Sequence, residues 1–223
     1  MRVAIIMITD ASLLRLLTWL SPAFPTGAFT CSHGLEWAVD AGDIRDANTL
    51  REWLTDILRH GAGRSDCILL RHAHAAAREP AALSELADLA AAVAPSRERF
   101  NETLGQGTAF LRAARAWGLP VLPDGSPYPV AVGALAGWHG IDEDGTVAAY
   151  LLAFTANLIS SAVRLVPLGQ SDGVRVLASL EPVILRIAAA TSAASLEDTG
   201  SCVFRADLAA MHHETQHTRL FRS

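Results

Sequence analysis

Apolar residues recur along almost the whole sequence with the spacing of an α-helix, and this periodicity constrains the fold more than any other feature. The clearest stripe occupies positions i, i+3, i+4, i+7 and i+8 of one segment: Leu50, Trp53, Leu54, Ile57 and Leu58. Thr49 and Glu52 form a capping-box pattern at its start, and Gly61 supplies a stop signal at its end. The segment is therefore predicted to be an amphipathic helix with one buried face.

Similar patterns, bounded by prolines and glycines, predict helices along the rest of the chain. The expected helices are one that carries Leu13 to Leu20 and ends at Pro22, and others over residues 32–40, 65–78, 80–95, from 96 onward, 130–138, 147–163, 173–194 (bent or interrupted at Pro182) and from Asp207. The long helix from Ser96 is expected to turn Phe100 and Trp117 inward. No segment has the alternation of a convincing strand.

The composition supports the same fold class. The chain is 51% hydrophobic but only 6% aromatic, and alanine supplies much of the difference, which favours helices by intrinsic propensity. Residues 118–129 are the one plausible boundary, but the composition is the same on both sides. We therefore expect an all-α protein, a single compact domain of about nine or ten helices over residues 1–223, with short flexible segments at 1–9 and 218–223.

Several chemistries are excluded by what the sequence lacks. The 18 basic residues are all arginine, so the chain has neither the lysine of a phosphate-binding P-loop nor the amine of a Schiff-base enzyme. A formal net charge of −5 argues against nucleic-acid binding, which depends on the neutralisation of phosphates. No serine lies in a nucleophile elbow, and no pair of carboxylates has the sequence context of a buried site.

The expected location is the cytoplasm. The three cysteines, Cys31, Cys67 and Cys202, include no closely spaced pair, and free thiols suit a reducing compartment. The apolar run before Asp10 is too short for a secretion signal. Residues 147–163 are strongly apolar but contain several polar side chains, so we interpret them as a core helix and expect no membrane span.

One pentapeptide matches a catalytic motif. Residues 213–217 read His-Glu-Thr-Gln-His, the pattern that on a helix places two imidazoles one turn apart to hold zinc. A zinc-dependent hydrolase is the alternative function that this motif suggests. Only six residues follow His217, however, so no downstream third ligand is available, and a polar exposed helix face is the simpler interpretation.

A second candidate metal contact is Cys31 with His33, a thiol and an imidazole at the exit of a proline-bearing loop. The two could touch nickel transiently. Alternatively, Cys31 is a small buried residue and His33 faces the following helix. The spacing does not decide between these interpretations.

Three blocks of sequence resemble the UreF family of urease accessory proteins. They are residues 14–38, which include the run Ser-Pro-Ala-Phe-Pro-Thr-Gly-Ala-Phe, residues 161–173, which include Pro-Leu-Gly-Gln, and residues 206–223. The blocks occur in the family's order and bracket nearly the whole chain. The family carries the His-Glu-Thr-Gln segment without being peptidases, although His217 and Cys31 stand where an aromatic residue is commoner.

The resemblance implies a function in nickel delivery. A UreF protein is expected to be a helical homodimer that binds UreD (UreH in some systems) and recruits the GTPase UreG onto apo-urease. It is expected to hydrolyse nothing and to hold no stable cofactor, since nickel is handled by the complex. The chain would act as a scaffold that helps to load nickel into the apoenzyme.

Two surfaces are candidates for these contacts. The segment Arg219, Leu220, Phe221 and Arg222 alternates cationic and apolar groups, so we expect it either to dock on the UreD-type partner or to pack on its own body. The loop of residues 22–32 with Glu36, and the helix end from Arg164 to Gln170, are candidates for the surface that meets the GTPase or the second copy. They could equally shape a core-facing turn.

Overall fold

The structure is a computed structural model of the whole chain, and it describes residues 10–223. Within this range there are ten α-helices: α1 (Asp10–Trp19), α2 (Leu35–Asp40), α3 (Ala47–His60), α4 (Ala62–Ala75), α5 (Pro80–Ala92), α6 (Arg97–Ala114), α7 (Tyr128–Trp138), α8 (Glu143–Leu165), α9 (Gln170–Ala190) and α10 (Phe204–His213). Three short 3₁₀ turns, η1 (Ala28–Thr30), η2 (Arg115–Trp117) and η3 (Leu196–Asp198), lie between them. The all-α prediction is confirmed.

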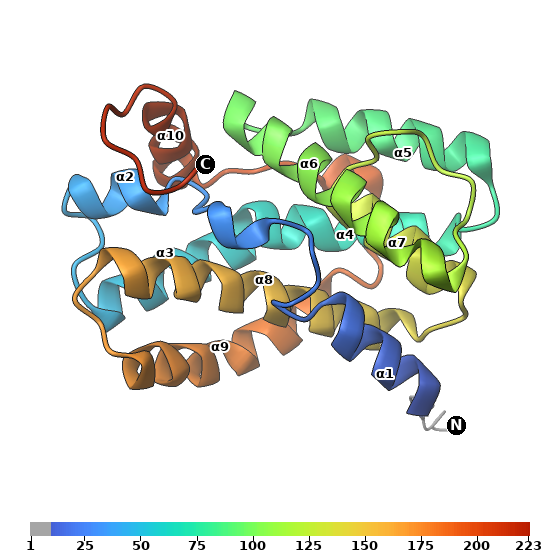
Figure 1. Cartoon of the computed structure of the whole chain (residues 1–223), viewed down its shortest axis with the longest axis horizontal. Coiled ribbons are helices and arrows are strands. Elements are labelled where there is room, and N and C mark those ends of the chain that lie inside the picture. The colour runs from blue at the N-terminus through green and yellow to red at the C-terminus, as the bar shows by residue number, and fades with distance from the viewer. Residues whose placement is uncertain (1–9) are drawn as a thin grey trace.

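Helix α4 lies at the centre and packs against α3, α5, α7 and α8 (Figure 1). Helix α9 packs on α8 and α3 along one edge of the molecule, and α2 and α10 pack together at one end. One continuous apolar core includes Trp19, Trp53 and Phe110, which are almost fully buried. At this end α10 contacts both α2 and α6, so three helices that are far apart in the sequence lie together.

Helices α4 and α7 approach closely because glycine stands at the crossing. A methyl group added to Gly133 would lie 2.2 Å from the carbonyl oxygen of Leu70, and one added to Gly137 would lie 2.2 Å from that of His74. Only hydrogen fits at either position. The contact explains why most of α7 is buried despite its short length.

Some helix boundaries differ from the prediction. The N-terminal cap of α3 is Asp46, whose carboxylate accepts the Thr49 N–H at 2.9 Å. The predicted capping box of Thr49 and Glu52 is therefore wrong, because the helix begins about one turn earlier. Phe100 is 38% exposed, because α6 turns Phe110 into the core instead. Helix α9 continues through Pro182, which lies on its exposed side and therefore removes no buried hydrogen bond.

Helix α8 is the one described segment with the length and apolar composition to cross a membrane. Half of its most apolar window is buried inside the protein, and its inward residues include Leu151 and Leu158 of the main core. The predicted core helix at residues 147–163 therefore lies within α8.

Candidate functional site

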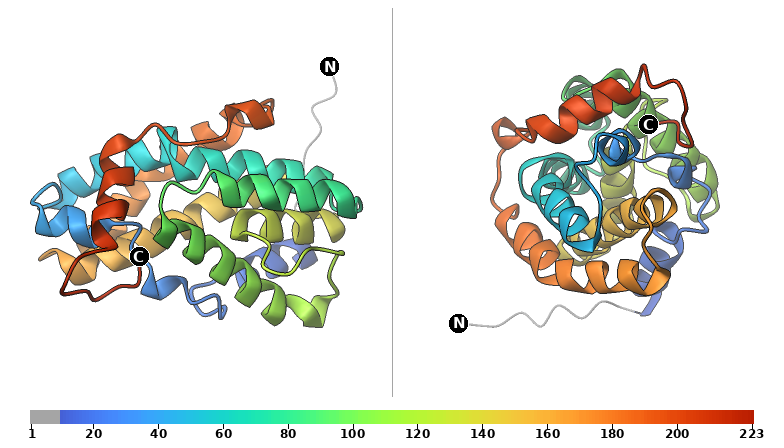
Figure 2. Two further views of the ribbon diagram at one scale, coloured as in Figure 1. Left: turned by 90° about the horizontal axis from the view of Figure 1, so that it is seen from above. Right: turned by 90° about the vertical axis from the view of Figure 1, so that its left-hand side faces the viewer.

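The last ten residues fold back over α2 and α6 (Figure 2). The N–H of Ser32 donates to a main-chain oxygen of Ser223 at 2.5 Å, and the Ser32 hydroxyl donates to the same oxygen at 2.6 Å. Phe221 is 4% exposed and Ser223 is 3% exposed. Residues 218–223, which we expected to be flexible, are thus held in place by buried contacts. Residues 1–9, also expected to be flexible, lie outside the described part of the chain.

Glu36 on α2 anchors this segment. Its carboxylate accepts the backbone N–H of Leu220 at 2.6 Å and that of Phe221 at 2.9 Å. Glu36 is 6% exposed, so it contacts its own chain rather than the open surface where we expected a partner. A buried carboxylate with several hydrogen bonds is expensive to disrupt, because removing it leaves the donors unpaired.

His213 connects Glu36 to α6. One ring nitrogen lies 3.2 Å from a Glu36 oxygen and the other 2.6 Å from Glu98, which also pairs with Arg219 at 2.7 Å. The imidazole is completely buried. Helix α10 ends at this residue, so His213 and His217 do not share a helix turn and the zinc-site geometry is not formed. His213 therefore does not lie on the polar exposed helix face that we expected, and that prediction is wrong for this residue.

A second ion cluster lies beneath the tail. Arg99 on α6 pairs with Glu102, 2.5 Å away, and His33 Nδ1 lies 3.0 Å from Arg99 and 3.1 Å from Glu102. Burial alone would raise the pKa of Glu102, but Arg99 and His33 outweigh it and hold that pKa well below its usual range. Burial, and then Arg99, lowers the pKa of His33 and keeps the imidazole neutral.

Asp66 on α4 adds a third carboxyl to this interior. It accepts the hydroxyl hydrogen of Tyr150 on α8 at 2.7 Å. Burial raises the pKa of Asp66 to about 6, although Arg99 and Tyr150 oppose the shift. The sequence did not indicate these carboxylates: Glu36 and Glu102 are buried, and Asp66 is half-buried.

Cys31 and His33 face different spaces. Cys31 lines a cavity with Glu98 and Arg222, whereas His33 lines two other cavities. Burial raises the pKa of the Cys31 thiol, which disfavours the thiolate that a metal would need. Over residues 10–223, no group of three or more histidine, cysteine or acidic side chains is arranged so that it could hold a metal ion.

The remaining predicted interface residues are exposed except for Phe221, and some of them also contact the chain itself. The Arg164 guanidinium lies 4.3 Å from the centre of the Phe221 ring and donates to the Phe29 carbonyl at 2.8 Å, so it fastens the tail and η1 to α8. Leu220 is 64% exposed. Arg222 and Gln170 are also exposed.

Sequence reasoning missed Glu98, Arg99 and Glu102. The three lie at i, i+1 and i+4, a spacing that gave Glu98 and Glu102 the same helix face. The available signal was that Arg99 and Glu102 lie on the same side of α6 as Gly107 and Phe110, which is its buried side. Charged residues on the buried side of a helix are expected to have oppositely charged or hydrogen-bonding partners. The sequence did not identify which residues these partners are.

Known proteins resemble this chain over nearly its full length. The UreF family model matches residues 44–181, from just before α3 into the middle of α9. A protein named "Urease accessory protein UreF" from Rhodopseudomonas palustris (strain BisB5) is 53% identical over 224 residues, which cover 96% of this chain and 92% of that protein. The chain belongs to the UreF family.

Two further UreF relatives agree. Proteins of the same name from Methylorubrum populi and Bradyrhizobium sp. (strain BTAi1) are 52% and 53% identical and cover 94% and 95% of this chain. The coverage extends beyond the family model to both ends of the fold. In this UreF chain, the first and last of the three blocks that carried the resemblance meet in space, because Ser32 and Glu36 hold Phe221 and Ser223.

Proposed function

We propose that this chain is a urease accessory protein that acts as a non-enzymatic cytoplasmic scaffold. It assembles as a homodimer with UreD (UreH) and the GTPase UreG, and this complex loads nickel into apo-urease. The observation that carries the proposal is the similarity to proteins named as urease accessory proteins, which cover 94–96% of the chain.

The arrangement of the polar side chains supports a scaffold. The polar atoms of the central cluster form hydrogen bonds and ion pairs that hold the chain's own segments together, and this cluster consists of Glu36, Glu98 and His213. Buried and fully paired groups of this kind fix one conformation of a surface rather than attack a substrate. Recognition of partners then falls to the outward side chains of the same region.

Those outward groups are Leu220, Arg222 and Gln170. Leu220 projects from a tail whose neighbours on both sides are anchored, so little entropy is lost when it binds. An exposed leucine flanked by two arginines suits an interface with an apolar centre and a charged rim. We assign the UreD-type contact to this outward side of residues 219–222.

Nickel contact at Cys31 and His33 belongs to the proposal as a transient event. Each side chain lines a separate cavity, so an ion would meet them one after the other. The variants Cys31→Ser and His33→Gln should reduce the nickel content of urease when either is expressed in place of the parent. Full nickel loading with both variants would remove direct contact from the proposal.

The function is tested by deleting only this gene from cells that carry the urease structural and accessory genes. We expect apo-urease without nickel and without activity, both restored when the gene is returned. Nickel-loaded, active urease in the deletion strain would contradict the function. A strain that lacks UreG serves as the reference for fully unloaded enzyme.

The partner surface is tested separately, with a matched control. Leu220→Glu should weaken binding to purified UreD by about tenfold, because it places a charge in the centre of the interface. Leu185→Glu on α9 is the control, since Leu185 is 62% exposed against 64% for Leu220. Equal affinities of the two variants would exclude the tail surface. Deletion of residues 219–223 is less suitable, because it also removes the buried Phe221.

A further inference from the structure

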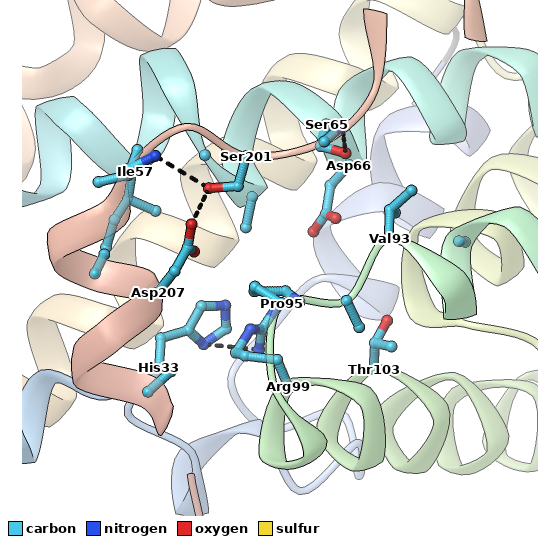
Figure 3. Close-up of a pocket in the computed structure, with 18 of the residues that line it drawn as sticks. His33, Ile57, Ser65, Asp66, Val93, Pro95, Arg99, Thr103, Ser201 and Asp207 are labelled. Atoms are coloured by element: carbon cyan, nitrogen blue, oxygen red, sulfur yellow. Dashed lines mark hydrogen bonds between the residues drawn. The ribbon is translucent and has the colours of Figure 1, made fainter. Parts of the chain in front are cut away.

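A cavity of about 60 Å³ opens between α3, α4, α6 and α10, beneath residues 200–203 (Figure 3). It belongs to none of the contacts that hold the tail. Its volume is several times the ~10–15 Å³ that one water molecule requires. It therefore has room for a group larger than water.

Two carboxyl groups project into this cavity. Figure 3 shows Asp66 descending from α4, and Asp207 on α10 with its carboxylate accepting a hydrogen bond from the Ser201 hydroxyl at 2.8 Å. Arg99 is nearby, but its charge is already matched by Glu102, 2.5 Å away. The negative charge of Asp66 and Asp207 is thus left without a dedicated cation.

His33 supplies an independent sign of a missing partner. Its Nδ1 faces Arg99 and Glu102, while its Nε2 is buried and has no hydrogen-bond partner. The residue is only 7% exposed, and Figure 3 shows the ring turned into the cavity. Buried polar atoms are rarely left unpaired, so this nitrogen points to an occupant.

The walls that lead to these groups are apolar. They are formed by Ile57, Leu69, Val93, Pro95, Val203 and Ala206. Ser201 at the rim is exposed to solvent. An apolar passage that ends at carboxylates matches a long basic side chain, whose hydrocarbon stem is buried while its charged head is paired.

We propose that this cavity receives an arginine or lysine side chain presented by a partner protein, with the cationic head between Asp66 and Asp207 and its stem against the apolar walls. An anion is disfavoured by the two carboxylates. A directly bound metal ion is disfavoured because the described residues offer no set of three ligands. A bound basic side chain brings donors to both carboxylates, and it can also donate to His33 Nε2 when Nδ1 carries the proton and donates to Glu102.

The titration of the two carboxyls supports this assignment. Burial raises the pKa of Asp66 to about 6 and also raises the pKa of Asp207. The positive charge of Arg99 opposes both shifts but does not cancel them. The other groups that act on them are Arg99, Glu102 and Tyr150 for Asp66, and Ser201 and Arg99 for Asp207. A cation would lower both pKa values, so its binding should strengthen as the pH rises from 5 to 7.

The test uses N-acetyl-arginine amide as the probe and N-acetyl-citrulline amide as its neutral counterpart of nearly the same shape. Backbone amide shifts of the full chain are followed by NMR at pH 7. We expect saturable shifts at Asp66, Ser201 and Asp207 with the arginine probe, and affinity at least about tenfold weaker with citrulline. No saturable shifts in this region, or equal affinity for the two probes, would overturn the proposal.

Substitutions locate the site. Asp207→Asn should weaken the arginine probe by about tenfold, whereas Asp88→Asn on the exposed side of α5 should leave it unchanged. Asp66→Asn is the second site variant, and it keeps an oxygen for the Tyr150 hydroxyl. Unchanged affinity in a folded variant of either site residue would refute the site. This result is independent of whether the chain serves urease.

Discussion

Two regions of this molecule are stabilised by different interactions. At the crossing of α4 and α7, Gly133 and Gly137 allow backbone to pack on backbone within an apolar core. At the end where α2, α6 and α10 meet, the contacts are carboxylates with arginine, imidazole and backbone N–H groups. The first region depends on shape and the second on charge, so they should respond differently to substitution and to pH.

The largest effect is expected at the apolar crossing of α4 and α7. Gly133→Ala places a methyl group 2.2 Å from the Leu70 carbonyl oxygen, a contact with backbone that no side-chain rotation relieves. We expect a loss of about 3–4 kcal/mol in the free energy of unfolding, or failure to fold. Urea denaturation measures it, and the loss should be the same at pH 5 and pH 8. A loss below 1 kcal/mol would show that α4 and α7 can separate cheaply.

At the charged end, Glu36→Gln is the most disruptive conservative change. Glutamine has one acceptor oxygen for the two N–H groups of Leu220 and Phe221, and its amide nitrogen would meet the other donor. We expect a loss of about 2–3 kcal/mol. Hydrogen exchange at these two amides should rise while amides in α7 stay protected. Protection lost evenly over the whole chain would mean that the tail and body are one cooperative unit.

Asp66 offers a test of the charged interior that uses pH. Its pKa is raised from 3.8 to about 6, so protonation favours the folded state, and this contribution is lost as the pH rises from 3.8 through about 6. Asp66→Asn should therefore stabilise the protein by about 1–2 kcal/mol more at pH 8 than at pH 4. Glu102, whose pKa is lowered, should show the opposite sign, with its stabilisation lost as the pH falls. A pH-independent effect of Asp66→Asn would contradict the burial of that carboxyl.

The comparison also shows what could be predicted from the sequence. Helical periodicity identified the apolar stripe of α3 and the core position of α8, because each pattern reports a face of its own helix. The charged end was not predictable in the same way. Glu36 and Phe221 are 185 positions apart, and a carboxylate that accepts backbone N–H groups leaves no sequence pattern. The sequence placed His213 within a zinc-binding motif, whereas the structure pairs it with Glu36 and Glu98 inside the protein.

The smallest expected effect is at Gly105, on the same helix as Glu102 but on its exposed side. A methyl group there meets no atom within 4 Å, so Gly105→Ala should only reduce the freedom of the unfolded chain. We expect a gain of about 0.5–1 kcal/mol in the free energy of unfolding, measured by urea denaturation at pH 7. Paired with Gly133→Ala, the same substitution then has opposite signs at two helical positions. A loss at Gly105 would mean that the exposed side of α6 is covered in solution.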